Sequence, residues 1–267
     1  MRRVWTPTAL LTTFVVGTSV ALLSQQQADQ NPIAFEVASI KPNTSGVEQM
    51  MIRTPPSGII TATNITTRLL IRYAYDLPEF LIIGAPNWSV TDHFDVVAKA
   101  PANATLSQLR GMFRALLADR FAFASHTSTQ EMPVDIVTVE SPGRLGPSLT
   151  ISTQRCEPPA PCGVRWAFGH IDARDATIGD LVSNLTVLSK RVVIDRTGLG
   201  GRYNFSLTYT PDAITLQSSL LSEFPKIDPD GPSLATALRE QLGLKLESTK
   251  GAVDVLMIDH VERPTPD

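Results

Sequence analysis

Two acidic-histidine pairs are the residues of this sequence whose types could support catalysis or metal binding. Asp92-His93 precedes a β-prone apolar segment, and Asp259-His260 stands near the end of another such segment. A histidine beside a carboxylate can transfer protons or hold a divalent metal ion. Because the pairs lie in different halves of the chain, a fold that joins them would create a hydrolytic site. The simpler interpretation is that both pairs are solvated strand ends.

The sequence lacks the common motifs of catalytic and nucleotide-binding sites. It contains no His-Glu-x-x-His, no Gly-x-Ser-x-Gly elbow and no Walker loop. The glycine-rich segment 198–201 lacks the third glycine of a dinucleotide fingerprint and precedes a strand pattern, which indicates a tight turn. We therefore expect no catalytic residue, no metal ligand and no cofactor, and we keep the four Asp and His residues as a candidate cluster.

The chain contains two cysteines, Cys156 and Cys162, which flank a proline-rich pentapeptide. Their spacing matches neither a redox Cys-x-x-Cys pair nor a zinc ribbon, so we predict a structural disulfide. Closure of so small a loop stabilises a fold by about 2 kcal/mol in the chain-entropy treatment. A stable disulfide indicates an oxidising compartment.

The N-terminal segment is typical of a targeting signal. Arg2 and Arg3 precede an uncharged apolar stretch, residues 9–23. That stretch is shorter than the roughly 20 residues of a membrane span and fits the core of a signal peptide. We predict that residues 1–28 are a signal peptide, with an uncleaved anchor as the alternative. Both interpretations place the protein outside the cytoplasm, in the periplasm or secreted.

Charge and composition narrow the class of partner. The 267-residue chain has a net charge of −3, and 43% of its residues are apolar. Its Lys and Arg residues are scattered, so we expect no nucleic-acid partner. We expect contact with a membrane only through the N-terminal segment, if that segment is not cleaved. The expected partner is an envelope protein or a small ligand.

The second half of the chain repeats the pattern of the first. The segments 60–65 and 171–176 resemble each other, and each precedes an apolar pattern with helical spacing. A period of this length indicates that one supersecondary unit is used twice. The aligned positions include Leu70 with Leu181 and Asp135 with Asp254.

We predict an α+β fold of two tandem β-α-β-β-α-β-β pseudo-repeats, with helices packed on antiparallel or mixed sheets. The first repeat spans residues 33–140 and the second spans residues 169–264. A Pro/Gly-rich linker at residues 141–168 contains the cysteine loop. Residues 211–231 form an insertion that the first repeat lacks.

The predicted helices are residues 65–75, 106–118 and 178–188, and one more that begins after Ser233 and ends at Gly243. Each repeat is expected to end in a β-hairpin. The first hairpin pairs residues 121–125 with 133–140, and the second pairs residues 244–248 with 253–261.

Several motifs occur in order along the chain: Phe35-Glu-Val-Ala-Ser-Ile-Lys-Pro42, Gly84-Ala-Pro-x-Trp88, Leu116-Leu-Ala-Asp-Arg-Phe121, Val193-Ile-Asp-Arg-Thr-Gly198, Glu240-Gln-Leu-Gly-Leu-Lys-Leu246 and Val255-Leu-Met-Ile-Asp-His-Val-Glu262. Together they resemble one secreted family of unknown function that is expanded in soil bacteria of the Acidobacteria type. The resemblance covers residues 33–264 and implies bacterial export, but it implies no activity, substrate or catalytic residue. Related domains stand beside membrane metallopeptidases of the β-lactam-sensor type, which implies an extracytoplasmic sensor or partner role.

Leu181, the segment 192–195 and the segment 237–244 follow one another in the second half of the chain. In these features the second half is also similar to the short N-terminal domains of secretins and TonB-dependent transporters. That similarity implies binding of protein partners in the periplasm.

Our first functional hypothesis is an exported, non-catalytic binding or interaction module. Its partner would bind at the seam between the repeats, at an open sheet edge or at the insertion. The alternative is a periplasmic hydrolase or other enzyme that uses Asp92, His93, Asp259 and His260. A purely structural envelope protein would have a rigid surface without a pocket.

Overall fold

The computed structural model describes residues 34–45, 49–55, 57–153, 155–157, 162–167, 169–211, 228 and 230–265. Within these residues, five α-helices and twelve strands form three four-stranded sheets, which confirms the predicted α+β class. None of the described helices is long and apolar enough to cross a membrane. The predicted signal peptide, residues 1–28, lies outside the described residues, as does most of the insertion at 211–231.

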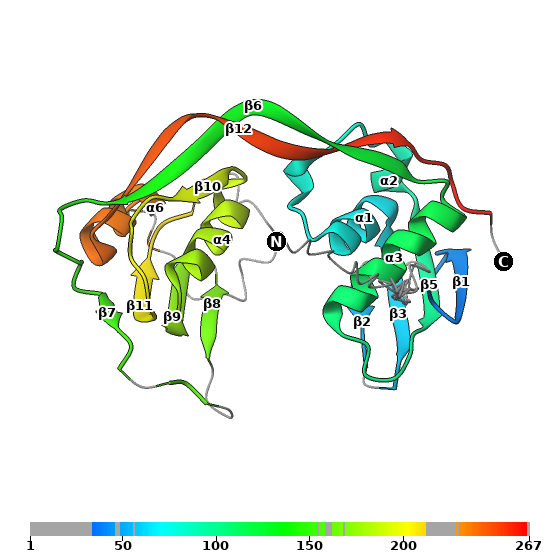
Figure 1. Cartoon of the computed structure of the whole chain (residues 1–267), viewed down its shortest axis with the longest axis horizontal. Helices are drawn as coiled ribbons and strands as arrows, with labels where there is room; N and C mark the ends of the chain where they lie inside the picture. Colours follow the sequence, from blue (N-terminus) through cyan, green and yellow to red (C-terminus); the bar gives the residue numbers. More distant parts are fainter. Residues whose placement is uncertain are drawn as a thin grey trace, which may run out of the picture. The chain divides into compact units, whose positions relative to one another are not determined.

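The first of the three sheets is antiparallel, and we call it the N-terminal sheet. Helices α1 (Thr67–Tyr75) and α3 (Leu106–Arg120) cover one of its faces (Figure 1). Leu70 of α1 and Phe113 of α3 are fully buried in the core between helices and sheet. The strands, in spatial order, are β1 (Val37–Pro42), β5 (His93–Lys99), β3 (Ile59–Thr66) and β2 (Met51–Arg53).

The second sheet, the C-terminal sheet, is also antiparallel. Its covering elements are α4 (Ile178–Ser189), α6 (Leu234–Ala237) and the π-helical turn η3 (Leu238–Leu242). The segment predicted as a linker, residues 141–168, supplies both of its edge strands. The strands, in spatial order, are β7 (Leu149–Ile151), β11 (Tyr203–Thr208), β9 (His170–Ala176) and β8 (Gly163–Ala167).

The third sheet connects the other two, and we call its two long strands the ribbon. In the ribbon, β6 (Ala124–Val139) and β12 (Leu244–His260) run antiparallel side by side (Figure 1). The short strands β10 (Val192–Asp195) and β4 (Ile82–Ile83) add in parallel to β6 and β12 respectively. A small core beneath the ribbon contains Val134, Val253 and Val255, packed with Leu81 of the 3-10 turn η1 (Glu79–Leu81).

The two predicted hairpins are wrong, because each is one continuous strand. The expected turns, residues 128–131 and 249–252, instead pair with the partner strand, with Met132 opposite Gly251. Their side chains are mostly exposed or partly exposed, because the middle of the ribbon has little protein packed on it. A polar segment of that kind has the composition of a turn, although its backbone is extended.

Side chains cap the starts of these helices, including the start predicted after Ser233. Thr66 accepts a hydrogen bond from the Leu69 amide and begins α1, and Thr105 forms a capping box with Gln108 at the start of α3. Ser233 caps α6, and Gly243 ends η3 with a φ of 70°. These local bonds satisfy amide groups that a helix end would otherwise leave without partners.

A bulge with the same chemistry occurs in both antiparallel sheets. Asn64 has a φ of 53° and donates its amide to Asp95 Oδ1 at 2.8 Å. Asp175 has a φ of 52° and donates its amide to Asn204 Oδ1 at 3.0 Å. In each case a side chain on the neighbouring strand holds the bulged amide. Each bulge lies near the end of its strand, just before the helix that follows: α1 after β3 and α4 after β9.

Candidate functional site

Asp92, the first of the predicted site residues, is part of an ion pair at the end of helix α2 (Trp88–Thr91). Arg263 Nε lies 2.7 Å from Asp92 Oδ2, and the Arg263 guanidinium stacks over the Trp88 ring at 5.1 Å. The hydrogen bond from Arg263 lowers the pKa of Asp92. These contacts attach the C-terminal segment to α2.

The other three predicted residues each have a polar partner outside the set. Within the described residues, no group of three or more His, Cys, Asp and Glu side chains is placed to hold a metal ion. The combined Asp–His cluster stays a prediction that these contacts do not test. The closest partners are Asn64 O for His93 at 3.1 Å, His126 Nδ1 for Asp259 at 2.8 Å and Glu262 Oε1 for His260 at 2.8 Å.

A Thr–His–Asp row lies on the face of the C-terminal sheet that points away from α4. His170 lies 3.0 Å from Thr208 Oγ1 and 2.6 Å from Asp172 Oδ2. The side chains of His170 and Asp172 are 41% and 42% exposed. An open sheet face does not exclude water or surround a reacting group, so we assign this row to surface hydrogen bonding.

The predicted disulfide is confirmed. The Cα atoms of Cys156 and Cys162 are 5.6 Å apart and the two sulfur atoms are bonded. A disulfide of this kind suggests an oxidising environment outside the cytoplasm.

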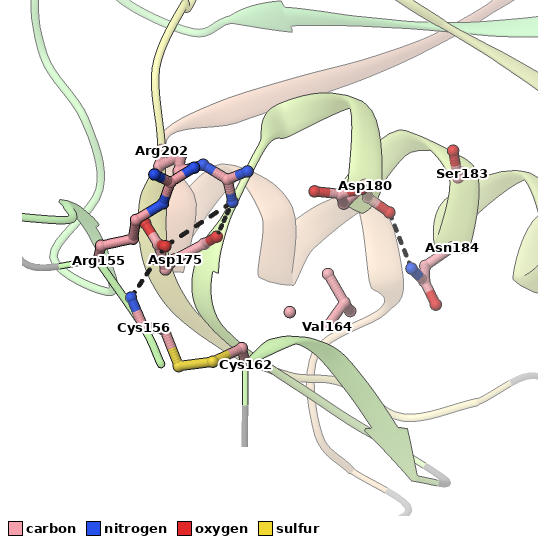
Figure 2. A pocket seen from close by; sticks show the side chains of 10 residues that line it. Arg155, Cys156, Cys162, Val164, Asp175, Asp180, Ser183, Asn184 and Arg202 are labelled. Carbon is pink, nitrogen blue, oxygen red and sulfur yellow. Dashed lines mark hydrogen bonds and ion pairs between the residues drawn. A yellow bond between two sulfur atoms is a disulfide. The ribbon is translucent and has the colours of Figure 1, made fainter. Parts of the chain in front are cut away.

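A pocket of about 400 Å³ lies between the disulfide and the first turns of α4 (Figure 2). In volume it is near the lower end of the range for small-molecule sites. The residues that line it are Arg155, Cys156, Cys162, Gly163, Val164, Asp175, Asp180, Ser183, Asn184 and Arg202.

Asp175 organises one wall of this pocket. Its side chain is 91% buried, since the bulge directs it inward, and its carboxylate accepts the Cys156 amide at 3.0 Å. That bond, together with the Ser152 side chain and the charges of Arg202 and Arg155, lowers the pKa of Asp175 against the opposing effect of burial. The carboxylate therefore attaches the disulfide loop to the sheet.

Two arginines stand on the same wall as Asp175 (Figure 2). Arg202 Nη1 donates to the Asp175 backbone oxygen and lies 3.8 Å from its carboxylate. The Arg202 side chain remains 50% exposed. Arg155 is exposed and acts on Asp175 through its charge. Because two guanidinium groups face one carboxylate, this wall keeps one positive charge.

Polar groups of α4 form the opposite wall (Figure 2). Thr177 and Asp180 form a capping box at the start of the helix. One turn later, Asn184 Nδ2 donates to the Asp180 backbone oxygen at 2.8 Å, so its amide oxygen is available as an acceptor. This wall carries the negative charge of Asp180.

The lining residues can bind a ligand, but they do not form a known catalytic arrangement. Both cysteines are bonded to each other, and the Ser183 hydroxyl donates to the Gly179 carbonyl, not to a base. Nucleophilic catalysis requires a nucleophile in contact with an activating group. The pocket is therefore a candidate binding site.

Sequence reasoning missed Arg155, Asp175 and Arg202. One signal was present, because Asp175 occupies the position of Asn64 in the aligned segments 60–65 and 171–176. The cysteine loop is a second signal, since the disulfide brings the residues next to Cys156 to the pocket that Asp175 and Arg202 also line.

Comparison with protein families shows to which family the chain belongs. Residues 68–261 match the family described as "Protein of unknown function (DUF3738)". Because the match spans well over half of the sequence, this protein belongs to that family. Comparisons with curated proteins and with solved structures found no match.

Proposed function

We propose that this protein is an exported, non-catalytic binding module that acts outside the cytoplasm and holds a small polar ligand in the disulfide pocket. The observation that carries this proposal is the pocket itself. One wall is basic, because Arg155 and Arg202 outweigh the charge of Asp175, and the opposite wall on α4 is acidic because of Asp180. Opposed charged walls around a small volume recognise polar ligands by orientation as well as by charge.

The pocket walls are held before a ligand arrives. The disulfide fixes the loop at Cys156, and the buried Asp175 carboxylate bonds to that loop. The capping box fixes Asp180 on the opposite wall. Preorganised groups lose little conformational freedom on binding, so a larger share of the contact energy appears as affinity.

Export is supported by the disulfide and by the signal-like N-terminal sequence. A bond between Cys156 and Cys162 persists in oxidising compartments. The apolar stretch at 9–23 has the length and charge pattern of a secretory signal.

We also propose that the module consists of two pseudo-repeats, residues 33–140 and 169–264. The bulges at Asn64 and Asp175 have the same backbone conformation and the same kind of side-chain acceptor. The strand orders β1-β5-β3-β2 and β7-β11-β9-β8 match element by element when β7 and β8, which come from the segment 141–168, are counted with the second repeat. The ribbon would be formed by the last strand of each repeat.

A ligand screen tests the proposed function. The oxidised full chain is titrated with pools of amino acids, sugars, carboxylates, phosphates and amines, and its thermal midpoint and amide NMR spectrum are recorded. We expect at least one pool to raise the midpoint and to shift amides of 155–157 and 178–184. The Arg155→Gln variant should lose this response, and Arg165→Gln, an exposed arginine outside the pocket, should keep it. Shifts confined to other regions would contradict the assignment.

The ribbon supports a second candidate function, the binding of a protein partner by strand addition. Among the described strands, β12 has a second neighbour only at 256–257, and β6 only at 134–137. The remaining edges expose backbone groups that an extended peptide can pair with. Cross-linking of the full chain to envelope proteins tests this function. Cross-links through Lys245 and Lys250 would support it, and cross-links elsewhere would contradict it.

A further inference from the structure

We infer that the ligand of the disulfide pocket is a small zwitterion of amino-acid size. Its carboxylate would bind Arg155 and Arg202, and its ammonium group would bind Asp180 and Asn184. This inference rests on the binding function proposed above and names the class of ligand.

The basic wall is suited to a carboxylate. Asp175 neutralises only one of the two guanidinium groups beside it, and its carboxylate also accepts the Cys156 amide. Arg202 directs one N–H to the Asp175 backbone oxygen, and a guanidinium has five N–H donors in all. The other donors of Arg202, together with those of Arg155, can form the paired bonds that arginine makes with carboxylates.

The opposite wall is suited to an ammonium group. Asp180 Oδ2 accepts both the amide and the hydroxyl of Thr177, each at 2.8 Å, which leaves Oδ1 as a further acceptor. The orientation of the Asn184 amide is fixed by its bond to the Asp180 backbone oxygen, so its Oδ1 is also an acceptor. The two residues are four apart on α4 and so share one face of the helix. An ammonium group has three N–H donors and no acceptor, which matches this wall.

Charge balance favours a zwitterion over a simple ion. Arg155 and Arg202 together with Asp175 and Asp180 sum to zero charge. An anion would pair with the basic wall but would bring negative charge towards Asp180, and a cation would do the converse at the arginines. A zwitterion pairs both walls without an unpaired charge in a partly closed space.

The volume of the pocket limits the size of the ligand. About 400 Å³ accommodates an amino acid or a short peptide but not a folded partner. Val164 and the disulfide also line the pocket and offer apolar contact to the carbon atoms of such a ligand (Figure 2).

Calorimetric titration of the oxidised full chain at neutral pH tests the inference. The probes are the twenty L-amino acids, followed by the N-acetyl and amide derivatives of the tightest binder. N-acetylation removes the ammonium charge, and amidation removes the carboxylate charge. We expect each derivative to bind about tenfold more weakly or worse, because each leaves one wall without its partner. β-Alanine and dialanine, in which the charges are further apart, determine the span between the walls.

Two variants distinguish recognition from a structural effect. Arg155→Gln should weaken binding of the amino acid and the N-acetyl derivative, with little effect on the amide derivative. Asp180→Asn keeps an oxygen for the Thr177 cap and should weaken binding of the amino acid and the amide derivative, with little effect on the N-acetyl derivative. A variant that merely distorts the pocket would weaken all three probes. Arg165→Gln should change none of them.

The outcomes separate the inference from the proposed function. Equal affinity for the amino acid and its N-acetyl derivative would overturn the zwitterion and leave an anion-binding module. Absence of binding by all zwitterions, with a ligand found in another pool of the screen, would also overturn only the inference. Absence of binding in every pool would overturn both.

Discussion

Two aspartates of the ribbon provide the sharpest test of how this fold is stabilised. Asp135 on β6 and Asp254 on β12 are equivalent under the proposed repeat, and each accepts a hydroxyl from the opposite strand. Ser248 Oγ lies 2.5 Å from Asp135 Oδ1, and Thr129 Oγ1 lies 2.6 Å from Asp254 Oδ1. Only Asp135 is buried, at 4% exposure. It also has a cation nearby, because Arg191 Nη1 lies 3.7 Å from its carboxylate.

Because only Asp135 is buried, removal of its carboxylate should lower the free energy of unfolding more than removal of the Asp254 carboxylate. Asp135→Ala removes a buried charged acceptor, which is typically worth about 2 kcal/mol, and leaves the Ser248 hydroxyl without it. Loss of the half-exposed Arg191 pair adds less than about 1 kcal/mol. Asp254→Ala removes a solvent-exposed bond and should cost about 0.5 kcal/mol. The two equivalent substitutions should therefore differ by about 2 kcal/mol in the free energy of unfolding.

Urea unfolding measures this difference. With a slope of about 2 kcal/mol/M, the two variants should differ in midpoint by about 1 M. The Asp135→Ala/Ser248→Ala double variant should cost less than the sum of its single variants, because both remove the same bond. Equal costs for Asp135→Ala and Asp254→Ala would refute the argument, because burial would then contribute nothing to the strength of the contact.

Three further predictions follow from the pocket and the turns. Because the pKa of Asp175 is lowered in the folded protein, its carboxylate contributes stability at pH values above the usual 3.8, and this contribution is lost as the pH falls through the lower folded value. The difference in unfolding free energy between wild type and Asp175→Asn should therefore be constant near neutral pH and shrink in acid, as stepped-pH urea titrations would show. Replacement of Cys156 and Cys162 by Ser should lower the free energy of unfolding by about 2 kcal/mol, and an unchanged urea midpoint would contradict this. Gly146→Ala should destabilise the fold by more than about 2 kcal/mol, because the added Cβ would collide with backbone atoms. Gly111→Ala, where the added Cβ would meet no atom within 4 Å, should stabilise α3 by about 0.5–1 kcal/mol. Thermal unfolding compares the two variants.

The helices could be predicted because the signals that start and end them are local. Thr105 with Gln108, Ser233 and Gly243 stand within a few residues of the amides and carbonyls that they satisfy. The apolar face of α4 is likewise visible in the sequence as Ile178, Leu181, Val182 and Leu185, which are all buried. Interactions that close over three or four residues leave a pattern that a single sequence shows.

The ribbon could not be predicted, because its pairing joins residues far apart in the chain. Residues 128–131 have turn-like composition, but they are extended because 252–255 on the opposite strand bond to them. The short edge strands β7 and β8 were missed for a related reason. With three and five residues beside prolines and glycines, they carry too little alternation to stand out from a loop.

The candidate pocket was only partly predictable. The disulfide could be predicted from the spacing of Cys156 and Cys162. The role of Asp175 could not, because it depends on a left-handed bulge that points the side chain at a loop nineteen residues earlier in the sequence. Conversely, Asp92 and His260 were selected for their chemistry, and in the structure they pair with Arg263 and Glu262.

Different contacts stabilise the pocket and the ribbon, and this difference determines whether binding at one affects binding at the other. The pocket walls depend on the disulfide, the Asp175 bulge and the capping box at Thr177, which are all local to the C-terminal sheet and α4. The ribbon reaches α4 through β10, where Thr186 Oγ1 accepts the Val193 amide at 3.0 Å, and through the apolar core that Val137 and Leu244 share with α4. Coupling between two sites requires an element that can adopt two arrangements, and the ligand of each site must bind one arrangement more tightly than the other. Since the walls are fixed by bonds that do not involve the ribbon, we expect a ligand in the pocket and a partner on the ribbon to bind independently.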